Sequence, residues 1–322
     1  MTEQFRCPLC DNTTFRVQRT LRDRIARTTV AEFALVACTR CGLLRLHPQP
    51  SAEVLAAAYP DDYAPFNRPG LSGRAKRLLE RKGVRDIWDY LQPPRAILDV
   101  GCAGGELLEL IWRAGNDDVH GLEPDGYAAG LARQRGIPVT EGYLETAGFP
   151  DERFSTILLD HVLEHVDDPD AFMAEVRRVL AGGGAVIIWL PNVASDAARL
   201  LGSYWMGYDA PRHLTTFSAR TLARLLDKHG FRVVRVHHEQ SGLEWAWGLR
   251  LWLRARFPAS EPWLARLHAL TIVAATPLGL FAARRKRSGR LRVIAVKRPD
   301  PETANPVRRI DVRQGSRAHR TS

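Results

Sequence analysis

The sequence predicts an α/β protein with a small cysteine-rich unit at its N-terminus. From about residue 93, short apolar strands alternate with amphipathic helices, a pattern typical of a parallel sheet covered by helices on both faces. Four of the five cysteines precede these elements, as two C-x-x-C pairs. A chain of 322 residues with 45% apolar residues is long enough for one large domain and a small accessory one.

The cysteine pairs predict a zinc ribbon over residues 1–50. The pairs are 27 residues apart, and the segment between them ends in the hairpin-like run FALVACTRCGLLRL. Four thiolates bind Zn²⁺ tetrahedrally and leave no open position, so we expect a structural ion without a chemical role. Because MTEQFRCPLC does not resemble a secretory signal, we expect reduced thiols and a cytoplasmic protein. The predicted ligands are Cys7, Cys10, Cys38 and Cys41.

A helical linker is predicted over 51–92, and the main domain over 93–298. Pro93 and Pro94 end the linker. Strands are predicted at 96–100, 119–123, 137–140, 154–159, 185–190, 231–237 and 291–296, and helices at 106–114, 126–135, 169–180 and 221–229.

An apolar helical insert, 241–290, precedes the last strand. Its run WLARLHALTIVAATPLGLFAA approaches membrane-spanning length, but Arg266, His268 and Pro277 interrupt it. A span would also separate the last strand from its sheet. We therefore expect 243–290 to contact a membrane surface as an in-plane or re-entrant helix. A lid or dimer interface, and an internal core helix, are the alternatives.

The positive charge is concentrated at the C-terminus. After Ala283 the chain has thirteen Lys and Arg against three acids, which accounts for the whole formal charge of +10. The preceding body is neutral, which argues against nucleic acid as a partner, although the ribbon contains several arginines. A basic segment beside an apolar one suits the inner face of a membrane; a solvated tail is the alternative. Residues 299–322 are predicted to be a disordered basic tail.

The most informative segment is ILDVGCAGGELLEL, residues 97–110. A strand enters a glycine-rich turn and a helix leaves it, so a ligand can approach the main chain. Asp99 precedes the turn, where its carboxylate can hold an amino group, and Glu123 ends the next strand, where it can accept ribose hydroxyls. The spacing differs from the dinucleotide G-x-G-x-x-G fingerprint. These details favour S-adenosylmethionine over a nicotinamide dinucleotide.

DVGCAGG, GLEPD and ILLDHVLEHVDDP together resemble motifs of class I S-adenosylmethionine-dependent methyltransferases. The resemblance runs from about residue 95 to 231, and the last strand extends it to about 297. It implies a Rossmann-like seven-stranded sheet with an antiparallel last strand. Two departures are Ala103, where the usual motif has glycine, and Ser155, where it has an acid. The implied cofactor contacts are Asp99, Gly101, Cys102, Ala103 and Gly105 beside the methionine part, Glu123 and Pro124 at the ribose, and Tyr143 and Leu144 at the adenine.

His161 is the first candidate for the catalytic base. It follows the fourth strand, and Glu164 and His165 lie one helical turn further on. These three residues could instead hold a divalent metal, as in some related quinone O-methyltransferases. A third interpretation is that Glu164 and His165 only cap and orient the loop.

His213 is the second candidate base. It lies in the aromatic loop YWMGYDAPRHLTTFS, where PRHLTTFS resembles a segment of sugar- and metabolite-modifying methyltransferases. Tyr208 and Arg212 are predicted substrate contacts. The alternative is a purely structural segment that leads to a helix N-cap at Ser218.

The resemblance therefore implies a methyltransferase, and we expect it to O-methylate a saccharide or a lipid-linked metabolite. C- or N-methylation of a nucleotide sugar or small metabolite is the alternative within enzymes. Outside enzymes, the chain could be a zinc-ribbon interaction protein whose domain binds the cofactor without turnover. The oligomeric state stays open.

Overall fold

The computed structural model describes residues 5–59, 86–91 and 93–299. Its centre is a seven-stranded sheet in the order β10-β11-β8-β7-β4-β5-β6. Strands β4 to β8 pair in parallel, whereas β11 is antiparallel to both β8 and β10. This confirms the Rossmann-like sheet with an antiparallel last strand. The strands are β4 Ile97–Val100, β5 Val119–Glu123, β6 Val139–Glu141, β7 Phe154–Asp160, β8 Leu180–Pro191, β10 Phe231–His238 and β11 Arg290–Lys297.

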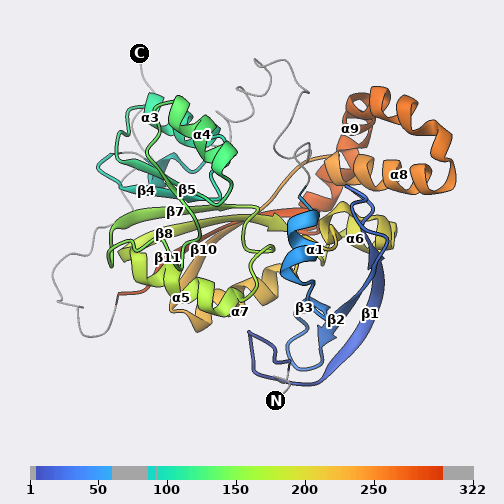
Figure 1. The fold of residues 1–322 in the computed structure, drawn as a ribbon, viewed down its shortest axis with the longest axis horizontal. Helices are drawn as coiled ribbons and strands as arrows, with labels where there is room; N and C mark the ends of the chain where they lie inside the picture. The colour runs from blue at the N-terminus through green and yellow to red at the C-terminus, as the bar shows by residue number, and fades with distance from the viewer. Residues whose placement is uncertain (1–4, 60–85, 92, 300–322) are drawn as a thin grey trace, which may run out of the picture.

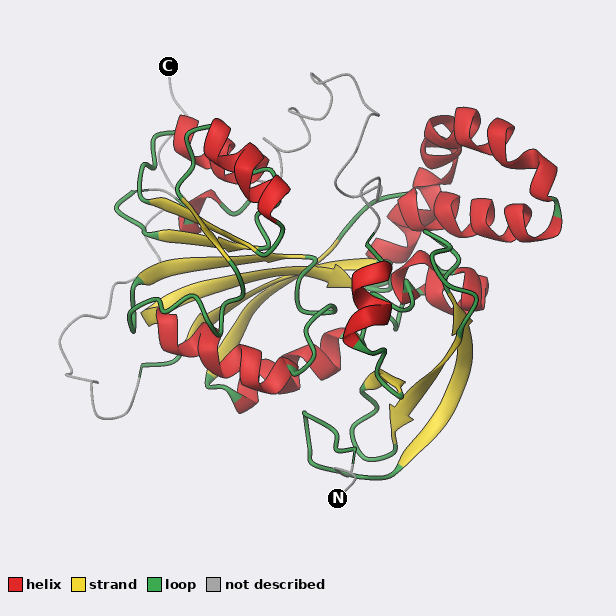
Figure 2. Cartoon of the chain, in the orientation of Figure 1, coloured by secondary structure: helices red, strands yellow, loops and turns green. Residues whose placement is uncertain are grey.

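Helices cover both faces of this sheet (Figure 1; Figure 2). Helices α3 (Glu106–Arg113) and α4 (Gly126–Gln134) lie over one face, and α5 (Pro169–Val179) and α7 (Ala219–Lys228) over the other. Each amphipathic helix buries its apolar side against the strands. Ser218 caps α7 with a capping box, which confirms the N-cap that the sequence predicts there.

The N-terminal unit is a second, antiparallel sheet that is completed by the main domain. Its strands are β1 (Phe15–Arg22), β2 (Glu32–Cys38), β3 (Leu44–His47) and β9 (Thr215–Thr216), paired in that order. Strand β9 comes from the loop that contains the second candidate base. The cysteine cluster also packs into the buried core of the main domain. The two units are therefore joined by main-chain pairing and by a common core.

The linker is described only at its ends. Helix α1 (Ala52–Ala57) begins at the N-cap Ser51, and a short 3-10 turn, η1, covers Trp88–Tyr90. The rest of the predicted helical linker, and the predicted disordered tail, lie outside the described residues.

The insert is a helical hairpin that projects from the sheet (Figure 1, orange). It consists of α8 (Leu243–Arg256), η4 (Pro258–Ser260) and α9 (Glu261–Arg284). Helix α9 continues through Pro277, so this proline does not interrupt the helix. Among the described residues, the segment Pro258–Arg284 is long and apolar enough to cross a membrane by length and composition, and little of it is buried. Shorter elements against α8 are α6 Asp196–Leu201, η2 Gly202–Tyr204 and η3 Met206–Tyr208.

Candidate functional site

The glycine-rich turn between β4 and α3 requires glycine at its two ends. Gly101 and Gly105 have φ angles of +69° and +78°, a region that L side chains rarely adopt. A Cβ atom on Gly105 would lie 2.8 Å from the Cβ atom of Ala132 in α4. The turn therefore packs directly against α4 and leaves main-chain atoms at the carboxyl edge of the sheet. Ala103, with φ +47°, donates its N–H to Glu123 Oε2 at 2.9 Å.

Two buried carboxylates border this turn. Glu123 accepts hydrogen bonds from the main chain of Ala103 and, at 3.0 Å, of Asp125. Asp99 is also buried, and its Oδ1 atom has no hydrogen-bond partner among the described residues. Burial, followed by the charges of Asp160 and Glu123, raises the pKa of Asp99 well above its usual value. An ammonium group is the partner that such a carboxylate lacks.

These groups fit the methionine and ribose parts of S-adenosylmethionine. The orphaned Asp99 oxygen can accept the ammonium group of the methionine moiety. Both oxygens of Glu123 retain a second lone pair for ribose hydroxyls, since each accepts one main-chain bond. The contacts expected at these residues stay predictions, but the donor and acceptor chemistry is suitable.

The remaining cofactor candidates lie at the same edge with different exposure. Cys102 is buried, and its Sγ lies 2.6 Å from the place of a Cβ on Gly121, so it fills the space beside β5. Burial raises the pKa of its thiol, which makes it a poor nucleophile. Leu144 is buried, whereas Tyr143 and Pro124 are exposed. The structure brings all these residues to the ends of β4, β5 and β6.

His161 follows β7 directly and is held by Glu164. Its Nδ1 atom lies 2.8 Å from Glu164 Oε1, and its φ angle is +57°. The Glu164 side chain is buried, while that of His161 is 35% exposed. Burial would lower the pKa of His161, but the Glu164 carboxylate outweighs it and raises that pKa. Burial would likewise raise the pKa of Glu164, but His161 outweighs it and lowers that pKa to about 2.

His213 lies beside the same glutamate. Ligand atoms of Glu164, His165 and His213 lie within 4.8 Å of one another, a geometry that could hold a metal ion. The sequence predicts a metal set of His161, Glu164 and His165. In the structure the Nδ1 atom of His161 contacts Glu164, and His213 replaces His161 in the set. The His165 and His213 rings meet edge to face, with centroids 4.7 Å apart. Burial, then His213, lowers the pKa of His165 to about 4.

The loop with His213 is fixed by main-chain bonds to Glu164. The Glu164 carbonyl accepts the N–H groups of Leu214, at 2.8 Å, and Thr215. His213 Nδ1 lies 2.9 Å from the Gly207 carbonyl. The two candidate bases, 52 positions apart in sequence, therefore meet around one residue.

Two residues of this loop that the sequence predicts as substrate contacts are buried in the structure. Arg212 is fully buried, and its guanidinium group forms ion pairs with Asp23 and Asp209 in the core. Tyr208 is also buried, with its ring 4.9 Å from that of Trp205.

Sequence reasoning missed two polar groups near the site. The Tyr59 hydroxyl, from the linker, lies 3.1 Å from His165 Nδ1. Glu244, on α8, is buried 3.0 Å from Arg290, and burial raises its pKa to about 7. An acidic residue within the apolar run LEWAW was the available signal.

The four cysteines of the ribbon converge. Their sulfur atoms lie within 4.8 Å of one another, with Cys7–Cys41 and Cys10–Cys38 each at 3.5 Å. All four are free thiols. Sulfur atoms bound to Zn²⁺ at about 2.3 Å in a tetrahedron have similar spacings. Burial would raise the pKa of the Cys38 thiol, but hydrogen bonds from the main-chain N–H groups of Cys41 and Arg40 outweigh it and lower that pKa to about 6. The cluster therefore fits a structural zinc ion.

Comparison with known proteins agrees with this geometry. A family model described as a methyltransferase domain matches residues 72–236, which is more than half of the chain. The chain belongs to the methyltransferase domain family. This confirms the resemblance that the three sequence motifs indicate.

Relatives of this methyltransferase-family chain include proteins from several bacteria. An uncharacterized protein of Mycobacterium tuberculosis is 31% identical over 188 residues, which cover 56% of this chain and 59% of that protein. A ubiquinone biosynthesis O-methyltransferase of Cereibacter sphaeroides is 32% identical over 126 residues, which cover 34% of this chain and 47% of that protein. The chain thus spans about three-fifths or less of the length of these curated relatives. A crystal structure of a SAM-dependent methyltransferase from Archaeoglobus fulgidus is 18% identical to this chain, with a TM-score of 0.49. The match covers 69% of this chain and 94% of that chain.

Proposed function

We propose that this protein transfers the methyl group of S-adenosylmethionine to a hydroxyl group of a saccharide or lipid-linked metabolite. The observation that carries the proposal is the buried Asp99 carboxylate at the carboxyl edge of the sheet, whose Oδ1 atom lacks a partner in the described part of the chain. Asp99 lies beside the glycine turn, and Glu123 ends the neighbouring strand. One elongated cationic nucleoside can therefore contact Asp99, the turn and Glu123 together.

His161 is the base favoured for this reaction. A bound S-adenosylmethionine would supply an activated methyl group on its sulfonium. The side chain of His161 is partly exposed, whereas His213 is buried. With Nδ1–H donated to Glu164, the Nε2 atom of neutral His161 can accept the proton of an acceptor hydroxyl. Glu164 then stabilises the imidazolium ion that forms, because its carboxylate is charged.

O-methylation is favoured by relatives that include ubiquinone biosynthesis O-methyltransferases. A lipid-linked acceptor is favoured by the exposed apolar helix α9, on which Leu270 is 65% and Val273 is 70% exposed. An exposed apolar surface of this kind suits a membrane interface. We accordingly propose a cytoplasmic protein that contacts the membrane through this insert.

The first test is calorimetric titration of the zinc-loaded protein with S-adenosylmethionine. We expect binding to the parent protein and a loss of at least about tenfold in affinity for Asp99→Asn, because a charge-assisted hydrogen bond becomes a neutral one. The matched control is Asp117→Asn, at an exposed position outside the site. Binding of a nicotinamide dinucleotide instead of S-adenosylmethionine contradicts the proposal.

The second test concerns turnover. Cell extracts are incubated with labelled S-adenosylmethionine, and the methylated product is identified by mass spectrometry. A methyl ether supports the proposal, while a new C–methyl or N–methyl group supports the alternative reactions. Binding without any labelled product supports the interaction-protein alternative. His161→Ala should lower turnover by about 10²-fold or more, whereas loss of activity only in His213→Ala would transfer the role of base to His213.

A further inference from the structure

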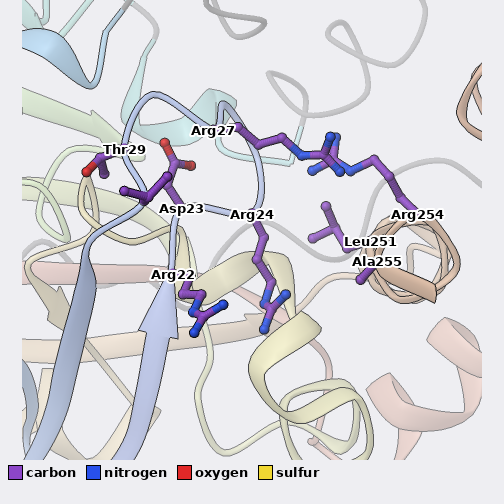
Figure 3. A pocket seen from close by; sticks show the side chains of 9 residues that line it. Arg22, Asp23, Arg24, Arg27, Thr29, Leu251, Arg254 and Ala255 are labelled. Carbon is purple, nitrogen blue, oxygen red and sulfur yellow. The ribbon is translucent and has the colours of Figure 1, made fainter. Parts of the chain in front are cut away.

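A cavity whose lining includes four arginines lies between the β1–β2 turn and helix α8 (Figure 3). Its volume is about 280 Å³. Arg22 ends β1, Arg24 and Arg27 come from the turn, and Arg254 comes from α8, 227 residues further along the chain than Arg27. The hydrophobic side chains of Leu251 and Ala255, on α8, form part of the wall.

The arginines of this cavity are incompletely neutralised. Arg22 pairs with Glu32, and Arg24 lies over the ring of Tyr204, 4.3 Å from its centroid. The Nε atom of Arg24 is buried and has no hydrogen-bond partner among the residues that the structure describes. Within the described part of the chain, neither Arg24 nor Arg27 has a carboxylate partner.

The one acidic side chain of the lining does not cancel this charge. Both oxygens of Asp23 are engaged: Oδ1 accepts from Arg212 Nη2 at 2.7 Å, and Oδ2 accepts the N–H and hydroxyl groups of Thr28, each at 2.8 Å. Asp23 is thus held by the buried Arg212, which Asp209 also binds. The four arginines of the lining still outnumber Asp23 and the two carboxylates beside them, Glu32 and Glu261, so the cavity keeps an excess of positive charge.

Arg27 and Arg254 point toward each other from the two walls (Figure 3). Glu261 lies 3.9 Å from Arg254, but the same Oε1 atom already accepts a hydrogen bond from Arg250. Burial, followed by the charge of Arg27, lowers the pKa of Arg254. Two cations held face to face repel each other unless an anion lies between them.

We propose that this cavity binds a phosphate or diphosphate group of the methyl acceptor. Paired guanidinium groups bind phosphate oxygens through parallel N–H···O bonds, which makes arginine well suited to this ligand. The volume is slightly below the range of roughly 300–1,000 Å³ for pockets that enclose whole small molecules. It suits one charged group of a larger acceptor. This inference rests on the proposed function, since it identifies the charged part of that acceptor.

One residue of the cavity contacts the loop that carries a candidate base. Asp23 lines the cavity and binds Arg212, the residue that precedes His213 in the chain. The apolar wall from α8 can contact the carbon chain next to the phosphate, and α8 packs on α9, the exposed apolar helix. A phosphorylated lipid carrier and a soluble sugar phosphate share the group recognised here.

The test is calorimetric titration of the full chain with inorganic pyrophosphate. We expect binding to the parent protein and a loss of at least about tenfold in affinity for the double variant Arg27→Gln/Arg254→Gln, because two charge-assisted interactions are removed. The matched control, Arg220→Gln/Arg224→Gln, removes the same charge from exposed positions on α7 and should change affinity less than about twofold. Circular dichroism verifies that each variant is folded.

A second arm distinguishes the source of the phosphate. The same variants are sedimented with phosphatidylcholine vesicles with and without phosphatidic acid. Reduced sedimentation of the Arg27/Arg254 variant on phosphatidic acid vesicles alone supports a lipid carrier. If the variant loses affinity for pyrophosphate but sediments like the control, a soluble phosphate ester is supported.

Equal pyrophosphate affinity in both double variants, or no binding to the parent, overturns the inference. S-adenosylmethionine titration of the same preparations separates this failure from that of the proposed function. Normal S-adenosylmethionine binding without pyrophosphate binding refutes only the proposed phosphate site. Pyrophosphate binding without S-adenosylmethionine binding refutes the proposed methyl transfer.

Discussion

Arg212 Nη2 donates a hydrogen bond to Asp23 Oδ1 at 2.7 Å, and both side chains are completely excluded from solvent. The two residues are 189 positions apart: Arg212 belongs to the main domain, and Asp23 to the turn between β1 and β2 of the N-terminal unit. Arg212 Nη1 also donates to the carbonyl of Ala58, at 3.0 Å. One guanidinium group thus joins the N-terminal sheet, the linker and the loop that carries His213.

Asp23→Asn should destabilise the protein by about 1.5–3 kcal/mol, because it removes one of the two carboxylates that bind a buried guanidinium group and weakens its charged hydrogen bonds. The free energy of unfolding by urea measures this. Asp227→Asn, which breaks the exposed pair with Arg298, is the control and should change it little. Similar effects of the two substitutions would show that the buried pair does not hold the units together.

Purified protein should contain one zinc ion per chain, and Cys7→Ser/Cys10→Ser should lose it, as measured by elemental mass spectrometry. Cys102→Ala, outside the cluster, should retain the ion. Because β3 pairs with β9 through Leu44 and Thr216, metal loss should also increase amide hydrogen exchange at residues 214–216. Unchanged exchange there would refute the coupling between the ribbon and the loop of His213.

Gly105→Ala should reduce both stability and affinity for S-adenosylmethionine. Its φ of +78° disfavours alanine, and the new Cβ would collide with Ala132, which shifts the turn. Gly115→Ala is the control, because its φ is also positive but no atom lies within 4 Å of the added Cβ. Cofactor affinity should fall for Gly105→Ala alone. Equal affinities would show that the turn does not border the cofactor.

Glu164→Gln should shift the acid limb of the pH–rate profile to lower pH. The Glu164 carboxylate raises the pKa of His161, so its removal lets His161 become neutral, and active as a base, at lower pH. Initial rates of methyl transfer as a function of pH measure the shift. A limb that moves to higher pH, or stays in place, would contradict the assignment of His161.

Leu270→Asp/Val273→Asp should reduce co-sedimentation with phosphatidylcholine vesicles, because two charges replace exposed apolar side chains on α9. Val17→Asp, at an exposed apolar position on β1, is the control. Equal sedimentation of all variants would exclude the insert as the membrane contact.

Most elements of the main domain were predictable because each carries a local signal. Asp168 and Pro169 mark the start of α5, and the run AVIIWL marks the centre of β8. The start of β8 was missed: the strand begins at Leu180, five residues earlier than predicted, because the glycines at 182–184 resemble a turn. Leu180 pairs with Phe154 of β7 and the pairing resumes at Ala185, so the glycines lie at an irregularity of the ladder that depends on a tertiary contact.

The candidate site was predicted in part. The glycine turn, Asp99 and Glu123 belong to a local strand–turn–helix pattern, and β4 and β5 place them side by side. The meeting of His161 and His213 at Glu164 was not predictable, because the connecting hydrogen bonds are made by the main chain of a distant loop. The ion pair of Arg212 was not predictable for the same reason, since its partner Asp23 lies in the distant turn between β1 and β2.

Local order in the chain was therefore enough for the strands, most helices, the glycine turn and the cysteine pairs, because periodicity, capping and spacing act over a few residues. The folded chain alone decided which charges are neutralised and which cavities stay charged. Arg212 is paired in the core, whereas Arg27 and Arg254 face each other across a cavity. Coulomb interactions depend on distance in space and on solvent exclusion, and neither quantity follows from the separation of residues along the chain.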